Sequence, residues 1–368
     1  MSGGVDSSVA AALLKKQGYF VIGVFMKLSG LNKEAEMRAR RVAKILKIPF
    51  FVLDARKEFK KKVVDNFLRE YKQGNTPNPC VVCNKEIKFG FLIKKALSLG
   101  ADFVATGHYV RLRPGDPNLR MTSECSEYSD NSDADSDYSD RILLKAKDKE
   151  KDQSYFLWQL NQKQLKHILF PIGEYTKPEV RKLAKKFKLP TAGTPESQEV
   201  CFVRGLTADF LKKYLKTKPG NIVDKNLPAQ ASNKILGKHQ GLWFYTIGQR
   251  KGIGLSGGPY YVIAKDFKNN NLIVSKNKKD LLQKELIAKN INWISGKKPK
   301  LPIKARVKIR YRTNLANATL NRSYTTILER SKIRVYRVVF DRPQRAVTPG
   351  QSVVFYLGRK LLGGGIII

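Results

Sequence analysis

The stretch MSGGVDSSVAAALLKKQG, residues 1–18, combines two adjacent glycines, serines and an aspartate with a helical run that follows at once. A glycine-rich turn that opens onto a helix presents unpaired backbone N–H groups and the positive end of the helix dipole, and both favour an anion. The stretch therefore predicts a phosphate-binding turn. Taken alone, its residues are explained equally well by an ordinary N-cap at Asp6 or Ser7.

Apolar segments alternate with helical patterns downstream of this turn. Continuous apolar runs predict buried strands over residues 19–26, 50–53 and 101–106. Helical patterns predict helices over about residues 33–46, 58–73 and 89–99. This alternation indicates an α/β fold with a doubly wound parallel sheet, in which ligands bind at the carboxyl ends of the strands. We expect the phosphate turn, Met26 and the turn at residues 106–108 to converge there.

The phosphate turn opens the printed sequence, whereas a turn of this kind normally follows a strand. Either the sheet lacks that strand, or the printed start lies downstream of the true start. We favour the second explanation, because an unpaired sheet edge beside a nucleotide site is a liability.

The net charge of +39, from 70 Lys and Arg against 31 Asp and Glu, indicates a polyanionic partner. Basic and aromatic residues are interleaved at residues 308–312, which suits phosphate contact and base stacking, so nucleic acid is favoured over a merely lysine-rich surface. The sequence has no apolar run long enough to span a membrane and no signal-peptide layout, so we expect a cytoplasmic protein with no membrane partner.

Composition predicts three domains within the 368 residues. They are an α/β domain over residues 1–205, a small β-rich central domain over 206–285 and a C-terminal β-barrel over 286–368. The barrel is expected because β-rich runs over residues 305–312, 325–328, 333–340 and 352–357 alternate with turns.

Residues 190–203 read as a loop that runs into a strand-like end. An acidic stretch at about 121–140 predicts a disordered insert, with Cys125 incidental.

The four cysteines, Cys80, Cys83, Cys125 and Cys201, are too few for a disulfide scaffold. Cys83 precedes a helix expected to begin near Lys85, where the helix dipole and a lysine can lower the pKa of a thiol. The CxxC at residues 80–83 has no second CxxC to complete a four-sulfur zinc site. Three thiolates including Cys201 would suit an iron–sulfur cluster with one open position.

The three histidines differ in their surroundings. His108 follows a predicted strand at the ligand-binding end of the sheet, so it is a candidate functional residue. His167 and His239 are expected to serve structure or the surface. The sequence contains no Ser/His/Asp triad and no HExxH motif.

Several motifs follow one another along nearly the whole chain. They are SGGVDSS at 2–8, GVFMK at 23–27, TPNPxxxCNKEIKFG at 76–90, ATGHY at 105–109, KDQSYFLW at 151–158, SQEVCFV at 197–203, GKHQGLWFYTIGQRKG at 237–252 and RPQRAVTPGQSVVFY at 342–356. With these motifs the chain resembles the bacterial tRNA-specific 2-thiouridylases of the PP-loop ATP pyrophosphatase superfamily. Those enzymes carry an adenine nucleotide alpha hydrolase-like domain and replace the C2 oxygen of the wobble uridine with sulfur.

The resemblance implies an ATP- and Mg²⁺-dependent reaction at position 34 of tRNA. ATP would adenylate the uracil C2 oxygen, and sulfur would then displace AMP. By resemblance, the residues that hold ATP would be Met1, Ser2, Gly3, Gly4, Val5, Asp6, Ser7, Met26 and Gly107. Asp6 or its neighbours would place Mg²⁺.

The resemblance also assigns the sulfur chemistry and the RNA contacts. Cys201 would carry a persulfide supplied by a cysteine desulfurase or a relay protein. Cys83 would be the nucleophile that releases the sulfur, which leaves a Cys83–Cys201 disulfide for a reductant. Glutamate, glutamine and lysine tRNAs would be the substrates. Their contacts would be Asn78, Pro79, Cys80, His108, Lys151, Asp152, Gln153, Arg310, Tyr311 and Gln351.

Alternatives to the persulfide enzyme remain open. Many family members carry Asp where this chain has Cys80, so the resulting CxxC makes a [4Fe-4S] cluster on Cys80, Cys83 and Cys201 a serious competitor, with an open iron that would hold the attacking hydrosulfide. Another adenylating enzyme, such as an argininosuccinate- or GMP-synthetase-like ligase, would need neither the cysteine pair nor a basic barrel. A catalytically impaired tRNA-binding protein is the candidate from a different class, and the intact Cys83 and Cys201 argue against it.

Overall fold

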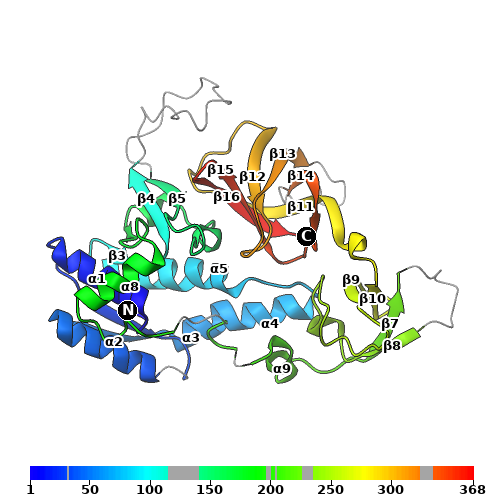
Figure 1. Ribbon diagram of the computed structural model, residues 1–368, viewed down its shortest axis with the longest axis horizontal. Coiled ribbons are helices and arrows are strands. Elements are labelled where there is room, and N and C mark those ends of the chain that lie inside the picture. The colour runs from blue at the N-terminus through cyan, green and yellow to red at the C-terminus, as the bar shows by residue number, and fades with distance from the viewer. Residues whose placement is uncertain (31–32, 115–140, 196–199, 204, 226–234, 324–334) are drawn as a thin grey trace.

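The computed structural model describes residues 1–30, 33–114, 141–195, 200–203, 205–225, 235–323 and 335–368. The expected acidic insert with Cys125 and the expected strand at 325–328 lie outside these residues. Figure 1 shows an N-terminal α/β domain, a small β domain at the opposite end of the long axis, and a barrel above them. None of the described helices is long and apolar enough to cross a membrane.

The N-terminal domain opens with helices and parallel strands in alternation. They are α1 (Val5–Lys16), β1 (Gly23–Lys27), α2 (Lys33–Leu46) and β2 (Phe50–Asp54). β1 and β2 pair in parallel, and so do β3 (Val104–Ala105) and β6 (Ile168–Leu169). The strand expected at 19–26 begins only at Gly23, because the side chains of Tyr19 and Phe20 are exposed. The parallel α/β architecture is otherwise as expected.

Two long helical segments lie between β2 and β3 in the chain. The first comprises α3 (Arg56–Phe59), η1 (Lys60–Val64) and α4 (Asp65–Lys72), and the second comprises α5 (Pro79–Cys83), η2 (Asn84–Phe91) and α6 (Leu92–Leu97). Both η segments are π-helical. Figure 1 shows the two segments side by side, reaching from the N-terminal domain toward the central domain.

The second helical segment begins ten residues before the expected start at residue 89. The Asn78 side chain accepts a hydrogen bond from the Val81 N–H at 3.4 Å, and Pro79 occupies the first helical position. Asn at the N-cap and Pro at the first turn both favour a helix start. Cys80 and Cys83 therefore lie inside the first turns of this helix, not before it.

The rest of the N-terminal domain is a hairpin followed by short helices. These elements are β4 (Val110–Pro114), β5 (Arg141–Lys145), η3 (Ser154–Phe156), α7 (Gln162–Leu165) and α8 (Lys177–Lys186). The core of the domain packs α1 against α2 and α8 through Val9, Val42 and Val180. Residues 200–203 form a turn, so the strand-like end expected there is wrong.

The central domain is a four-stranded sheet with the order β8-β7-β10-β9. Its elements are α9 (Thr207–Lys212), β7 (Gly220–Asp224), β8 (Ile235–His239), η4 (Leu242–Phe244), β9 (Tyr261–Asp266), β10 (Asn271–Ser275) and η5 (Lys278–Leu281). β7 and β10 pair in parallel and the other neighbours are antiparallel. Ile222, Leu272 and Val274 are fully buried and form its small core.

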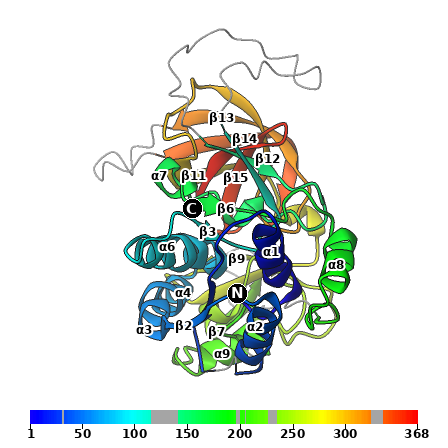
Figure 2. The same cartoon turned by 90° about the vertical axis from the view of Figure 1, so that its left-hand side faces the viewer.

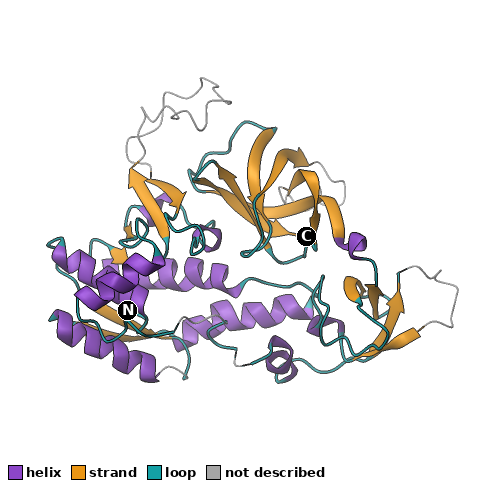
Figure 3. Ribbon diagram, in the orientation of Figure 1, coloured by secondary structure: helices purple, strands orange, loops and turns teal. Residues whose placement is uncertain are grey.

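The C-terminal domain is a closed barrel, as expected, and Figure 3 shows it built almost entirely of strands. Its strands are β11 (Leu282–Trp293), β12 (Ile303–Lys308), β13 (Ala316–Ser323), β14 (Val335–Arg345), β15 (Ser352–Leu357) and β16 (Lys360–Ile367). The order β11-β14-β13-β12-β15-β16 closes through a β11–β16 pairing. On β12, Ala305 and Val307 are buried in the barrel, so the alternate residues Arg306 and Lys308 face outward.

The barrel and the N-terminal domain share a sheet and a core. β16 also pairs with β5 at Lys360 and Leu144, which extends the barrel sheet into the β4–β5 hairpin. Trp158 Nε1 donates to Ser352 Oγ at 3.0 Å and is buried in the common core. Figure 2 shows the barrel stacked directly on the helices of the N-terminal domain.

Candidate active site

The predicted phosphate turn is held open by glycine. Gly3 has φ +75°, and a Cβ there would lie 2.2 Å from the Ala35 carbonyl oxygen. Gly4 is the N-cap of α1 and offers no side chain to bond the first-turn N–H groups. Ser2 Oγ and Ser7 Oγ lie 3.1 Å apart across the turn. The arrangement leaves a helix N-terminus without a side-chain cap, which suits a polyphosphate.

Gly107, from the segment after β3, closes over this turn as the sequence predicted. A Cβ on Gly107 would lie 2.6 Å from the backbone N of Ser7 and 2.7 Å from the carbonyl carbon of Asp6. Only glycine allows this approach. The structure thus brings together Gly107 and the predicted nucleotide residues at positions 1–7, while Met26 lies near the end of β1 and packs beside Cys83.

Asp6 is held by two residues that the sequence analysis missed. Lys177 Nζ contacts both carboxylate oxygens of Asp6, at 2.8 and 2.9 Å, and the Tyr109 hydroxyl donates to Oδ1 at 2.8 Å. Lys177 is buried at the first position of α8. A positive charge at a helix N-terminus is unfavourable, because it meets the positive end of the helix dipole. A lysine at the start of a predicted helix was therefore the sequence signal that this residue has an acidic partner. Asp6 Oδ2 accepts only from Lys177 and keeps a free lone pair, so the role expected of Asp6 in placing Mg²⁺ stays a prediction.

Cys83 shares a hydrophobic cluster with the two residues that follow Cys201. Buried Cys83 packs with Phe202 and Val203, which directly follow Cys201, and with Met26. Phe202 also stacks edge-on against Phe59, at 5.6 Å between ring centroids. The cluster therefore anchors the Cys201 turn beside the helix that carries Cys83, at the carboxyl end of β1.

The expectation of a lowered thiol pKa at Cys83 is wrong. Burial raises the pKa of Cys83 to about 12, and the nearby charge of Lys88 only partly opposes this rise. Burial likewise raises the pKa values of Cys80 and Cys201, although both side chains reach solvent, because neighbouring protein desolvates their thiolates. All three are free thiols that hold their protons near neutral pH.

Lys88 is the cation shared by this site. Lys88 lies on the π-helical segment η2, in which the Leu92 N–H bonds to the Ile87 carbonyl. Its charge partly opposes the rise that burial causes in the pKa values of Cys80 and Cys83, and it adds to the fall that burial causes in the pKa of His108.

His108 is buried and neutral. Burial lowers its pKa well below the usual value, with Lys88 acting in the same direction. Its Nδ1 lies 2.8 Å from Thr106 Oγ1, and its ring lies 5.7 Å from that of Phe89. The Thr106 contact fixes the orientation of the ring, so His108 presents a fixed neutral imidazole.

The described residues do not support a metal centre. Among them, no group of three or more His, Cys, Asp or Glu side chains is arranged to hold a metal ion. Cys80, Cys83 and Cys201 are all described and are free thiols, and the structure shows no iron–sulfur ligand set among them.

The predicted RNA residues of the N-terminal domain lie close together but are engaged in the protein. Asn78 caps α5, and Pro79 is buried. The Asp152 carboxylate accepts from the Ala146 and Ser154 N–H groups. Gln153 Oε1 accepts from the Tyr109 N–H at 3.0 Å. These contacts place the neighbouring Lys151, which is partly exposed, on the loop after β5.

The predicted RNA residues of the barrel lie at its contacts with the other domains. The Arg310 guanidinium donates to the Ile247 carbonyl at 2.9 Å and also to Thr348. The Tyr311 ring lies 4.5 Å from that of Phe156. Gln351 Nε2 donates to the Thr76 carbonyl at 2.7 Å, and the Thr76 N–H donates to the Pro349 carbonyl at 2.8 Å. The barrel thus holds the loop that leads into α5.

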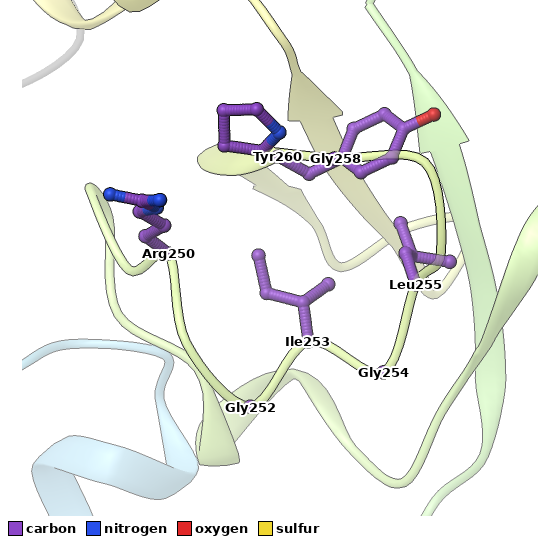
Figure 4. A pocket seen from close by; sticks show the side chains of 8 residues that line it. Arg250, Gly252, Ile253, Gly254, Leu255, Gly258 and Tyr260 are labelled. Atoms are coloured by element: carbon purple, nitrogen blue, oxygen red, sulfur yellow. The ribbon is translucent and has the colours of Figure 1, made fainter.

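A separate pocket of about 330 Å³ lies in the central domain. Figure 4 shows Arg250, Ile253, Leu255 and Tyr260 around it, on the glycine-rich segment before β9. None of the sequence-predicted site residues lines this pocket.

The fold and the site together define a PP-loop nucleotide-binding protein with two accessory β domains. Three family models cover the chain: "tRNA methyl transferase HUP domain" over residues 1–205, "tRNA methyl transferase PRC-barrel domain" over 208–276 and "Aminomethyltransferase beta-barrel domain" over 283–367. Curated proteins named tRNA-specific 2-thiouridylase MnmA align with the full chain. The chain belongs to the tRNA-specific 2-thiouridylase family.

Three relatives illustrate the similarity. The protein of Clostridioides difficile strain 630 is 42% identical, and the alignment covers 100% of this chain and 96% of the relative. The proteins of Syntrophomonas wolfei and Carboxydothermus hydrogenoformans are 44% and 43% identical, with 98% and 96% of their lengths covered and the whole of this chain in each case. All three carry the name given above, which describes sulfurtransferases acting on tRNA.

Proposed function

We propose that this protein is an ATP-dependent tRNA uridine 2-sulfurtransferase that thiolates the wobble uridine at position 34. The observation that carries the proposal is the shared cluster of Met26, Cys83 and the residues after Cys201, which lies at the carboxyl end of β1. The Met1 amino group donates to the Val24 carbonyl, so the chain that enters the glycine turn lies against the same strand. A site that activates an oxygen with ATP and replaces it with sulfur needs a polyphosphate cradle and thiols side by side.

The first half of the reaction makes a leaving group. The uracil O2 attacks the α-phosphorus of ATP, and pyrophosphate leaves. The N–H groups at the start of α1 would bind the phosphates, with Gly107 shaping the cradle and Lys177 holding Asp6 in place. Mg²⁺ would enter with the nucleotide and neutralise phosphate charge.

The second half of the reaction delivers sulfur. A donor protein leaves a persulfide on Cys201, and the Cys83 sulfur attacks the Cys201 sulfur. The Cys83 proton passes to the departing sulfur, so hydrogen sulfide forms together with a Cys83–Cys201 disulfide. Sulfide then adds at C2 of the uracil and AMP leaves. A dithiol reductant restores both thiols. Lys88 supports this step, because its charge stabilises sulfur anions at both cysteines.

The test combines unmodified glutamate tRNA, ATP, Mg²⁺ and a persulfide donor, and measures 2-thiouridine by mass spectrometry. Cys201→Ala and Cys83→Ala should make no product, whereas Cys125→Ala, which removes a cysteine assigned no role, should retain activity. Equal product from Cys201→Ala would show that the sulfur-carrier assignment is wrong. Binding of tRNA without product by the wild type would instead favour a catalytically impaired tRNA-binding protein.

The same preparations test the iron–sulfur alternative. Protein purified anaerobically should be active without iron or acid-labile sulfide under the persulfide mechanism. Iron that is lost together with activity in Cys80→Ala would overturn that mechanism in favour of a cluster. We favour the persulfide route because the residues that follow Cys201 pack in the same cluster as Cys83.

A further inference from the structure

Three cations from two domains meet where the N-terminal domain joins the barrel. Lys145 ends β5 of the N-terminal domain, whereas Arg306 and Lys308 lie on the outward face of β12. The sheet order β12-β15-β16-β5 brings them to the two sides of Tyr356 on β15. Arg306 pairs with Tyr356 in register, and Lys145 Nζ lies 4.3 Å from the centre of its ring. We call Lys145, Arg306 and Lys308 the cationic seam.

The cationic seam has no acidic partner in the part of the chain that the structure describes. None of its three side chains forms an ion pair with a described carboxylate. Asp152 is the acid that influences Lys145 and Lys308, but its carboxylate already accepts from two backbone N–H groups and from the Ser154 hydroxyl. Three like charges are therefore gathered with only the charge of Asp152 to offset them.

The electrostatics of the seam favour an anion. Burial lowers the pKa of Lys145 to about 8, and the charges of Arg306 and Lys308 add to this while Asp152 opposes it. Burial also lowers the pKa of Lys308, and Asp152 again acts in the opposite direction. A bound anion would stabilise both ammonium groups, since opposite charge favours the charged form.

The surroundings of the seam select a nucleic-acid phosphate. Lys308 Nζ lies 5.5 Å from the centre of the Tyr311 ring, and Tyr311 packs on Phe156. Cations beside partly exposed aromatic rings suit a strand that offers both phosphates and bases. We propose that the cationic seam binds a backbone phosphate of tRNA, so that one RNA strand contacts the N-terminal domain and the barrel together. The identity of the RNA rests on the proposed function.

The test is the affinity of unmodified glutamate tRNA for Lys145→Met and Lys308→Met, measured by fluorescence anisotropy over a range of salt concentrations. Each variant should bind several-fold more weakly, and the slope of log affinity against log salt should fall by about 0.7–0.9 per lost phosphate contact. Lys44→Met is the matched control, because Lys44 is exposed on α2 and loses the same charge. The control should keep the wild-type affinity and slope.

Three outcomes would overturn the proposal. The first is wild-type affinity and salt slope in both variants. The second is a lowered melting temperature of Lys145→Met with unchanged tRNA affinity, which would make the cations counter-charges for Asp152. The third uses inorganic phosphate as probe: a rise in wild-type melting temperature that Lys145→Met loses, with unchanged tRNA affinity, would assign the seam to free phosphate. Because binding requires no thiolation, failure of this inference is distinct from failure of the proposed reaction.

Discussion

Replacing Lys177 by Met should lower the free energy of unfolding by about 3 kcal/mol, because it leaves Asp6 without its ion pair. Removing one partner of a buried pair costs about 3–5 kcal/mol. Lys177 meets that condition with 9% of its side chain exposed, whereas Asp6 is 30% exposed and keeps the hydrogen bond from Tyr109. The lower end of the range therefore applies. ATP affinity should fall as well, since Asp6 belongs to the first turn of α1.

The assay is urea unfolding of the full chain, followed by tryptophan fluorescence, with ATP binding measured by calorimetry. A loss of about 3 kcal/mol reduces the folding equilibrium constant on the order of a hundredfold. Lys147→Met is the matched control, because the Lys147–Glu179 pair at 3.1 Å is exposed and should contribute less than about 1 kcal/mol. Equal destabilisation of the two variants, or none in Lys177→Met, would refute the reasoning.

Gly107→Ala should abolish ATP binding, because the added Cβ would lie 2.6 Å from the Ser7 backbone N. Gly193→Ala is the control, because a Cβ there meets no atom within 4 Å. Wild-type ATP affinity in Gly107→Ala would contradict the proposed phosphate site. Cys83 should be alkylated at pH 8 about a thousandfold more slowly in the native protein than in urea, because burial raises its pKa to about 12. The alkylation rate of the native protein should rise about tenfold per pH unit. Equal alkylation rates in the native protein and in urea would disprove this. Gln351→Ala should lower kcat with the tRNA Kd unchanged, because Gln351 holds the Thr76 loop; a raised Kd alone would assign Gln351 to RNA contact.

Much of the architecture follows from local patterns in the sequence. The amphipathic period over residues 33–46 matches α2, which buries one face, and the continuous apolar run over residues 352–357 matches β15, which is buried on both faces. The glycine turn was also readable, since Gly3 must adopt a positive φ and Gly107 must approach a backbone closely. Helix and strand periodicity and the conformational needs of glycine can each be recognised from a single residue or a short stretch of sequence.

The remaining parts of the site depend on long-range packing. Lys177 meets Asp6 across 171 residues of chain, and no local pattern encodes that pairing. The pKa of Cys83 was misjudged because it is set by Phe202 and other residues that bury the thiol, not by the helix start. The helix start itself was readable from Asn78 and Pro79, an N-cap followed by a first-turn proline.

The pairing of β5 with the last strand has a consequence for how the protein is made. Leu144 is synthesised long before Lys360, its partner on β16. At about 5–20 residues per second, the ribosome needs roughly 10–40 s to travel between them. During that interval the hairpin edge and the buried face of Trp158, which later contacts Ser352, lack their cover. A nascent chain stalled before β16 would therefore carry a finished nucleotide turn but an open sheet edge, and chaperones that shield such edges would be expected to bind it.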